Sequence, residues 1–227
     1  MDQLRAVDAL SSGWLAGVLL LALGIVAWVN MVSPKQWPVL ARSFGALRLG
    51  KHRLREDLDM RDRTLTGLVV LSTVVIAMFA YQVLLYRGWI GHGFVEFGRV
   101  LLVVTVVSLA QVAFLRAISL LPATDGGTEE YLYTVILMHV VMGLFLLPVV
   151  TVMSFPWRVA WREWAWIVGV AIIILTILFR WIRAATIGVG NGVPLRYIFI
   201  YLCALEILPF GLAIEYARHF VPPSPHL

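Results

Sequence analysis

The twelve residues Val168–Phe179 read VGVAIIILTILF and contain no charged side chain. They show no alternation of apolar and polar residues, which disfavours a strand of a membrane β-barrel. Followed outward, the apolar segment extends from Trp164 to Trp181, close to the roughly 20 residues that a helix needs to cross bilayer hydrocarbon. Hydrocarbon offers the backbone no hydrogen-bond partners, so a segment of this kind crosses the membrane as a helix.

Five other segments have the same character. The six predicted spans cover residues 14–32, 65–86, 100–121, 133–155, 164–181 and 197–216. Apolar residues make up 61% of the 227-residue chain and charged residues 14%, against roughly 45–50% and about 25% in soluble proteins. A soluble domain of this size has too little interior for so much apolar surface. We expect one all-α integral membrane domain over residues 1–227, a polytopic bundle of about six transmembrane helices.

The first span is expected to be a retained helix and not a cleaved signal peptide. Asp2 and Asp8 precede it with only Arg5 as counter-charge, and no small-residue cleavage site follows it. Its glycines Gly13, Gly17 and Gly24 share one side at spacings of four and seven. Small residues at such spacings permit close helix contact, either within the molecule or in a homo-oligomer.

Basic residues gather after the first span. Eight of the 18 Lys and Arg lie between Lys35 and Arg63, a juxtamembrane position that indicates topology and anionic headgroups, not nucleic acid. If residues 33–64 are cytoplasmic, twelve Lys and Arg fall inside and six outside. Both chain termini are therefore predicted outside the cytoplasm.

Residues 33–64 also contain apolar residues at helical spacing, namely Trp37, Leu40, Phe44 and Leu47. This pattern predicts an interfacial helix on the cytoplasmic leaflet. The basic residues expected to face lipid headgroups or a partner are Arg42, Arg48, Lys51, Arg53 and Arg55. From residue 51 to 63 basic and acidic residues alternate, which fits either a solvated helical extension or a docking surface.

Glu206 is the most unusual residue of the sixth predicted span. Ten residues from Arg196, it lies about 15 Å from the cytoplasmic boundary. An acid at that depth costs at least about 2.5–3.5 kcal/mol unless it is protonated, hydrated or paired. Pro209 should kink the same helix and free the carbonyl of Leu205. Glu206 is either part of a proton or cation site, or a structural hydrogen-bonding group between helices.

Two embedded polar residues could meet Glu206, His139 in the fourth span and Gln111 in the third. Arg116 and Arg180 lie nearer the helix ends, where their long side chains are expected to reach headgroups. Pro148 should bend the fourth helix. A His139–Glu206 pair would form a short proton relay, whereas a single membrane histidine also serves as a structural hydrogen-bonding group.

The sequence predicts no metal or cofactor site. Cys203 is the single cysteine, and no Cys/His spacing resembles a zinc or iron–sulfur site. One embedded histidine does not support a bis-histidine haem. Without a nucleophile–base pair, an enzyme is disfavoured, although the sequence does not decide the question.

Residues 201–209, YLCALEILP, resemble the closing motif of a Bacteroidota family of multi-pass inner-membrane proteins, a family defined by a domain of unknown function. The layout is similar along the chain, with a basic stretch after the first helix and a Leu147-Pro148 step in the fourth. The resemblance implies a bacterial cytoplasmic (inner) membrane protein and no particular activity. This chain departs from the family in its Arg and Trp content and in its Pro-rich end, residues 222–225.

Two functions remain open at this point. The first is a non-catalytic subunit or assembly factor of a cell-envelope complex, with the bilayer and other membrane proteins as partners. The second is a small proton-coupled transporter that uses Glu206. Proline-broken helices are typical of transporters, yet no inverted repeat is visible in the six spans.

Overall fold

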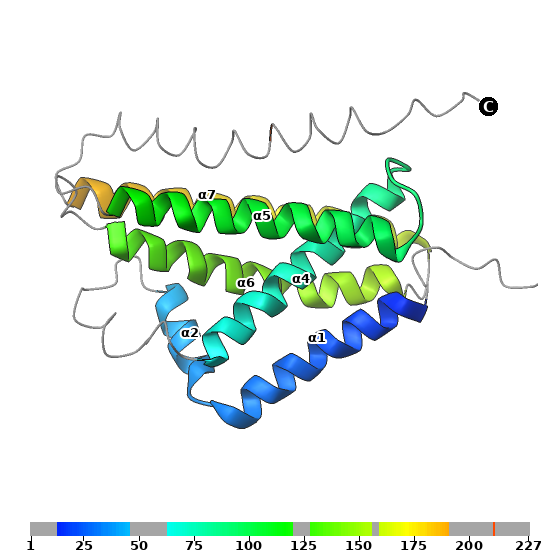
Figure 1. The fold of residues 1–227 in the computed structure, drawn as a ribbon, viewed down its shortest axis with the longest axis horizontal. Coiled ribbons are helices and arrows are strands. Elements are labelled where there is room, and N and C mark those ends of the chain that lie inside the picture. The colour runs from blue at the N-terminus through cyan, green and yellow to red at the C-terminus, as the bar shows by residue number, and fades with distance from the viewer. Residues whose placement is uncertain (1–12, 46–62, 120–127, 156–158, 191–210, 212–227) are drawn as a thin grey trace, which may run out of the picture.

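The computed structural model of the protein describes residues 13–45, 63–119, 128–155, 159–190 and 211. This part of the chain is all helical (Figure 1). Its elements are α1 (Gly13–Val32), α2 (Gln36–Gly45), α4 (Arg63–Tyr86), α5 (Phe94–Ser119), α6 (Thr128–Ser154) and α7 (Val159–Gly190). All of these except α2 are long and apolar enough to cross a membrane, which confirms the predicted polytopic helix bundle. The sixth predicted span lies outside the described residues, apart from Gly211.

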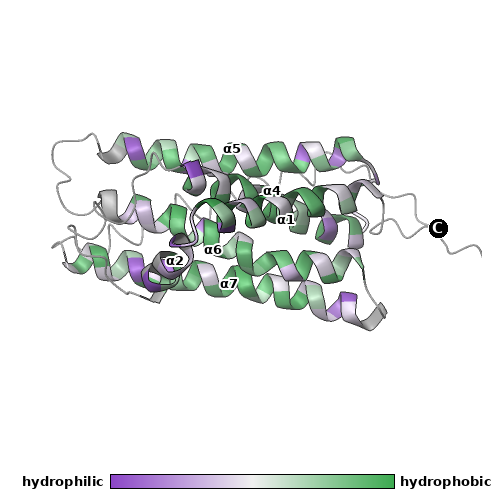
Figure 2. Ribbon diagram, turned by 90° about the horizontal axis from the view of Figure 1, so that it is seen from below, coloured by the Kyte–Doolittle hydropathy of each residue, from purple (hydrophilic) through white to green (hydrophobic). Residues whose placement is uncertain are grey.

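The long helices extend beyond the predicted spans. α5 begins at Phe94 and not near residue 100, and its first turns carry an ion pair between Arg99 Nη1 and Glu96 Oε1 at 2.8 Å. α7 has 32 residues, about 48 Å of helix, which exceeds the roughly 30 Å of bilayer hydrocarbon. Apolar residues cover the middle of the bundle and hydrophilic residues lie toward its ends (Figure 2). Hydropathy predicts only the hydrocarbon-length portion of each helix, so the polar extensions were missed.

Successive long helices run in opposite directions along the long axis of the molecule (Figure 1). We call the end that contains α2 the α2 end. It also contains the end of α1, the starts of α4 and α6 and the last turn of α7. Since α4 and α6 both begin there, these two helices are parallel to each other.

The centre of the bundle is the contact between α4 and α6. About half of the span residues of these helices are buried, 56% in α4 and 50% in α6, against 6% in α5. Six of the twelve buried residues of α4 recur at alternating intervals of three and four. They are Leu68, Leu71, Val75, Met78, Gln82 and Leu85. This is the spacing of a coiled-coil contact, which packs side chains of one helix between those of its neighbour.

Glycines allow the close approaches in this core. A Cβ on Gly143 of α6 would overlap the backbone and side chain of Ser72 on α4. A Cβ on Gly169 of α7 would overlap the Phe79 ring, and Gly67 of α4 lies against the Trp28 ring of α1. Small residues at helix contacts are typical of membrane bundles, where close packing replaces the hydrophobic effect. Gly143 therefore sets the separation of α4 and α6.

The glycines that the sequence singled out lie elsewhere. Gly13, Gly17 and Gly24 of α1 are exposed, and a Cβ on any of them would meet nothing within 4 Å. The side of α1 that packs on the bundle is the opposite one. Its buried residues are Leu15, Leu19, Ala22 and Val29. Within the described residues the glycine side of α1 has no neighbouring helix, so the intramolecular contact that the sequence allowed is not formed there.

The predicted amphipathic helix forms as α2, and its apolar side faces the bundle. Leu40 is buried, with 7% of its surface exposed. The ring of Phe44 lies 5.2 Å from that of Phe179 on α7 and 6.2 Å from that of Phe145 on α6, measured between ring centroids. α2 is thereby fixed on α6 and α7, and Arg42 in its last turn is left exposed.

An aromatic cluster fixes the other end of α1. Trp14 contacts Tyr81 of α4 at 5.5 Å and Phe97 of α5 at 5.3 Å between ring centroids. The Tyr81 hydroxyl accepts a hydrogen bond from the backbone N–H of Gly93 at 3.2 Å. Aromatic pairs at such distances add about 0.5–1.5 kcal/mol beyond burial. Three helices are joined at this end.

The close approach at Gly143 predicts a large effect for a small substitution. Gly143→Ala should lower the free energy of unfolding by about 1–3 kcal/mol, because the added methyl group overlaps Ser72 and overpacks the α4–α6 contact. Gly24→Ala is the matched control, since its Cβ enters open space. Thermal unfolding of the purified protein in detergent measures both. Equal unfolding temperatures for the two variants would contradict the packing described.

Candidate functional site

The polar side chains inside the bundle fall into three places. Ser72, Thr73 and His139 lie at the middle of the α4–α6 contact. Gln82 and Ser154 lie along the same contact, farther from the α2 end. At the α2 end, the guanidinium groups of α7 meet the start of α6.

His139 is held by Thr73. Its Nε2 lies 3.0 Å from Thr73 Oγ1, and this oxygen also lies 2.9 Å from the backbone carbonyl oxygen of Val69. A hydroxyl group has a single hydrogen. The hydroxyl therefore donates to one of these two partners at a time, and the direction of its bond to His139 depends on which ring nitrogen carries the proton. In either case the contact joins α6 to α4.

The Ser72 hydroxyl reinforces the same contact. It donates to the backbone carbonyl of Val140 at 3.1 Å, beside the close approach at Gly143. In helical membrane proteins such interhelical hydrogen bonds contribute about 0.6 kcal/mol on average and about 1.7 at most. These bonds stabilise the bundle modestly and fix how the two helices align.

Gln82 joins the helices a second time. Its Nε2 donates to Ser154 Oγ at 2.7 Å and reaches the Val150 carbonyl oxygen at 3.5 Å. Both side chains are fully buried, and Gln82 Oε1 has no hydrogen-bond partner within the part of the chain that the structure describes. Ser72 bonds to residue 140 and Gln82 to residue 150, so the partners in each pair are 68 positions apart. Two parallel helices require such a constant separation along their contact.

The buried cations near the α2 end belong to α7. Arg183 is fully buried, with an exposed fraction of 0%, and the Arg180 guanidinium carbon lies 6.0 Å from the centroid of the Tyr131 ring. A guanidinium over an aromatic ring is favourable at this distance. Both arginines make further interactions.

Arg180 and Arg116, both expected to reach headgroups, differ in their surroundings. The Arg180 side chain is half-buried, and Nε and Nη2 are shielded, because α7 packs along α6 and presents Arg180 to the Tyr131 ring. Arg116 in the last turn of α5 is exposed. Hydropathy does not distinguish Arg180 from Arg116, because both residues lie near the end of an apolar segment.

Several residues that the sequence singled out do not take part in these contacts, or lie outside the residues that the structure describes. Gln111 is half-buried on α5 and makes no side-chain hydrogen bond within the described residues. Pro148 is exposed, and α6 continues through it. The predictions for the following residues lie outside the described part of the chain: Glu206, Pro209, Arg48, Lys51, Arg53 and Arg55.

Sequence reasoning missed Thr73 as the partner of His139, and also the Ser72, Gln82 and Ser154 contacts. Three polar side chains, Ser72, Thr73 and Gln82, within one predicted span were an available signal, since polar residues in membrane helices favour the bundle interior. Among the described residues no three His, Cys, Asp or Glu side chains gather where they could hold a metal ion.

Comparison with known proteins gives one match. A family model described as "Domain of unknown function (DUF4271)" matches residues 15–217, which include nearly all of α1 and all the other described helices. No curated protein and no solved structure matches the chain.

The hydrogen bond between Thr73 and His139 predicts coupling between the two positions. In a double-mutant cycle with Thr73→Val and His139→Leu, the coupling energy should be about 0.6–1.7 kcal/mol. Thr73→Ser, which keeps the hydroxyl, serves as the control and should retain the coupling. Denaturation in mixed micelles provides the free energies. Additive effects of the two substitutions would show that the hydrogen bond contributes nothing.

Proposed function

The chain belongs to the family defined by that domain of unknown function, and on this premise we propose that it is a non-catalytic subunit or assembly factor of a bacterial cell-envelope complex in the cytoplasmic membrane. Five apolar helices make it a multi-pass membrane protein. The proposal assigns the central helices to scaffolding and the outer surface of α1 to contact with other membrane proteins.

The polar groups between α4 and α6 support scaffolding. The Ser72 hydroxyl and the Gln82 amide reach the backbone or a hydroxyl group of the other helix. The Thr73 hydroxyl lies within hydrogen-bond distance of both His139 on the other helix and the Val69 carbonyl oxygen of its own helix. All of these contacts can serve to align the two helices.

The observation that carries the proposal is the outward side of α1. Among its exposed residues, Gly17, Leu20, Gly24 and Ala27 recur at intervals of three and four, opposite the side that packs on the bundle. Three of these four residues are small, and small residues leave room for the close approach of another helix. Lipid acyl chains do not require this space, so a helix of another membrane protein fits the outward side of α1 better.

The charges support the proposed orientation. Among the described side chains, six Lys and Arg residues lie at the α2 end. They are Lys35, Arg42, Arg63, Arg116, Arg180 and Arg183. The opposite end has Arg87, Arg99 and Arg162 together with Glu96 and Glu163. Because cytoplasmic loops carry the excess of Lys and Arg, we propose that the α2 end is cytoplasmic and that both termini lie outside.

The competing function is a small proton-coupled carrier that uses Glu206. His139 would be the next group in such a path. Its Nε2 is hydrogen-bonded to Thr73, whose hydroxyl also lies 2.9 Å from the Val69 carbonyl oxygen. A carrier would need further groups beyond this pair, Glu206 among them.

Purification of the tagged protein from its native membrane in mild detergent tests the proposal. A stoichiometric set of envelope proteins should accompany the wild type and be lost in Gly17→Leu/Gly24→Leu, because two large side chains fill the outward side of α1. That variant should still accumulate, since both positions are open. Gly98→Leu on α5, also an open position, is the matched control and should keep the partners.

A clean monomer or homodimer would contradict the proposal. Proton flux in reconstituted vesicles then distinguishes the carrier. Glu206→Gln should abolish flux without loss of protein if the acid carries protons. If Glu206 is structural, Gln should be tolerated while Glu206→Leu lowers accumulation, because leucine cannot form the hydrogen bond.

A further inference from the structure

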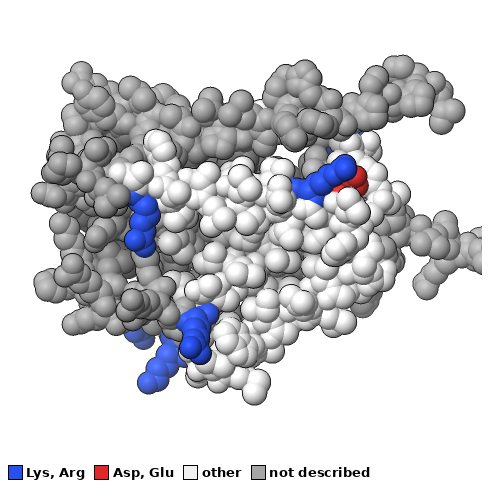
Figure 3. All heavy atoms as spheres, viewed as in Figure 1, with Lys and Arg blue, Asp and Glu red and all other residues white. Residues whose placement is uncertain are grey.

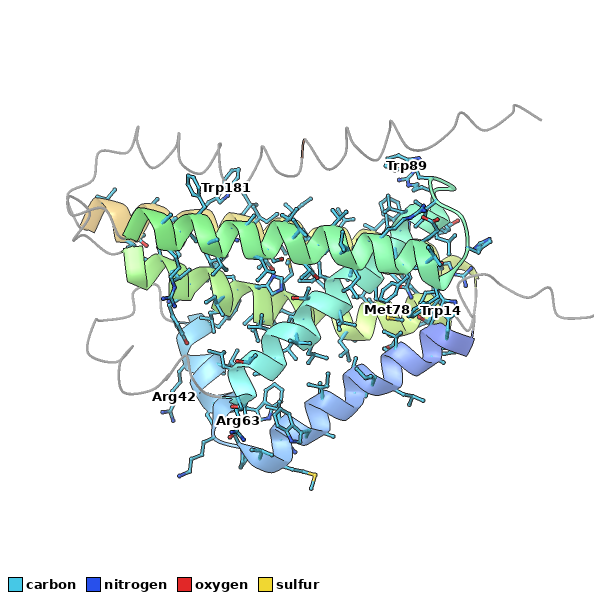
Figure 4. The ribbon with its side chains drawn as sticks, in the orientation of Figure 1. Trp14, Arg42, Arg63, Met78, Trp89 and Trp181 are labelled. Atoms are coloured by element: carbon cyan, nitrogen blue, oxygen red, sulfur yellow. The ribbon has the colours of Figure 1, made fainter. Side chains whose placement is uncertain are left out.

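Three exposed cations lie on the segments that join α1, α2 and α4. Lys35 lies in the turn between α1 and α2, Arg42 in the last turn of α2, and Arg63 is the first residue of α4. Arg42 and Arg63 project from the same corner of the molecule (Figure 4). We call these three residues the basic patch. None of them forms an ion pair within the described residues.

The fold keeps the basic patch outside the bundle. Leu40 and Phe44 of α2 pack against α6 and α7, so the polar side of α2 with Arg42 is turned away from them. Charged side chains lie toward the two ends of the long axis, and the face between them is uncharged (Figure 3). The patch is therefore at the level where apolar helix surface ends.

Apolar surface borders the patch directly. At the end of α1, Met31 is 83% exposed and Val32 56%, and Lys35 follows three residues later. Leu21 and Trp28 precede Val32 by eleven and four residues, which places all three on one side of the helix, and both are exposed. A fixed cationic group above a continuous apolar helix surface matches a phospholipid, whose anionic headgroup and acyl chains have the same order. An acidic protein segment would pair with the charges but would leave the apolar surface beside them uncovered.

We infer that Lys35, Arg42 and Arg63 bind the headgroup phosphate of an anionic phospholipid whose acyl chains lie along the side of α1 that carries Leu21, Trp28 and Val32. Guanidinium groups bind phosphate oxygens in pairs, and the lysine ammonium adds a point charge. Each basic residue near an anionic membrane surface contributes about a fivefold gain in binding. The inference does not depend on the proposed function, because it concerns lipid and not a protein partner.

Native mass spectrometry of the full-length protein in detergent tests this. Phosphatidylglycerol and phosphatidylcholine with identical acyl chains are added in equal amounts. The wild type should retain phosphatidylglycerol preferentially. Lys35→Gln should lower that preference by about fivefold, and Arg42→Gln/Arg63→Gln should remove most of it. The lysine variant Arg42→Lys/Arg63→Lys keeps the charge and should retain part of the preference.

Arg87→Gln/Arg99→Gln, at the opposite end, removes the same number of charges and should leave the preference unchanged. Because the patch residues are exposed, their variants should unfold at the wild-type temperature, which separates lost binding from lost folding. Equal retention of the two lipids by the wild type would overturn the inference and leave an acidic protein segment as the occupant. Displacement of the lipid by millimolar inorganic phosphate would also overturn it, because the site would then recognise a free anion.

Discussion

The bundle is organised around the place where α4 and α6 approach each other, with Ser72 of one helix against Gly143 of the other. A glycine at this position lets the backbones come close enough for the Ser72 hydroxyl to reach the Val140 carbonyl. Dispersion contacts fall off steeply with separation, so the apolar residues along the two helices pack well only at this distance. α1 and α7 are then added through Trp28 on Gly67 and Phe79 on Gly169, two further contacts of a ring with a glycine.

The hydrogen bonds in this core fix how α4 and α6 align more than they add to the free energy of unfolding. Interhelical bonds in membranes average about 0.6 kcal/mol, too little to hold helices together singly. Ser72 and Gln82 nevertheless pair with α6 at the same offset, and His139 adds a third bond from α6 to Thr73. A shift of either helix would leave these groups unpaired in an apolar interior, where an unsatisfied polar group costs about 1–3 kcal/mol. The polar residues thus select one alignment among many that an apolar surface would tolerate.

The two proposals use different parts of the same helix. The outward side of α1 offers the small residues Gly17, Gly24 and Ala27 to another helix, whereas its last residues, Met31 and Val32, lead to the basic patch. Both follow from one arrangement, in which α1 is placed at the edge of the bundle and buries only the side that faces α4. The face between the two charged ends of the molecule is uncharged (Figure 3). Its extent would set the depth in a bilayer of both the outward side of α1 and the basic patch. The chemistry of Glu206 remains a separate prediction outside the described residues.

The sequence by itself determined the helical class, the position of five membrane helices and the amphipathic α2, because hydrocarbon thickness and the need to pair the backbone act on composition and length alone. Only the tertiary structure decided which side of each helix is buried. Lipid tails are as apolar as leucine, so a uniformly apolar helix has no pattern that distinguishes its buried side from its lipid side. For this reason Gly143 packs inward while Gly17 and Gly24 face outward, His139 bonds to Thr73, and Arg183 is buried although it ends an apolar run. Each of these depends on a neighbouring helix distant in the chain, which composition cannot specify.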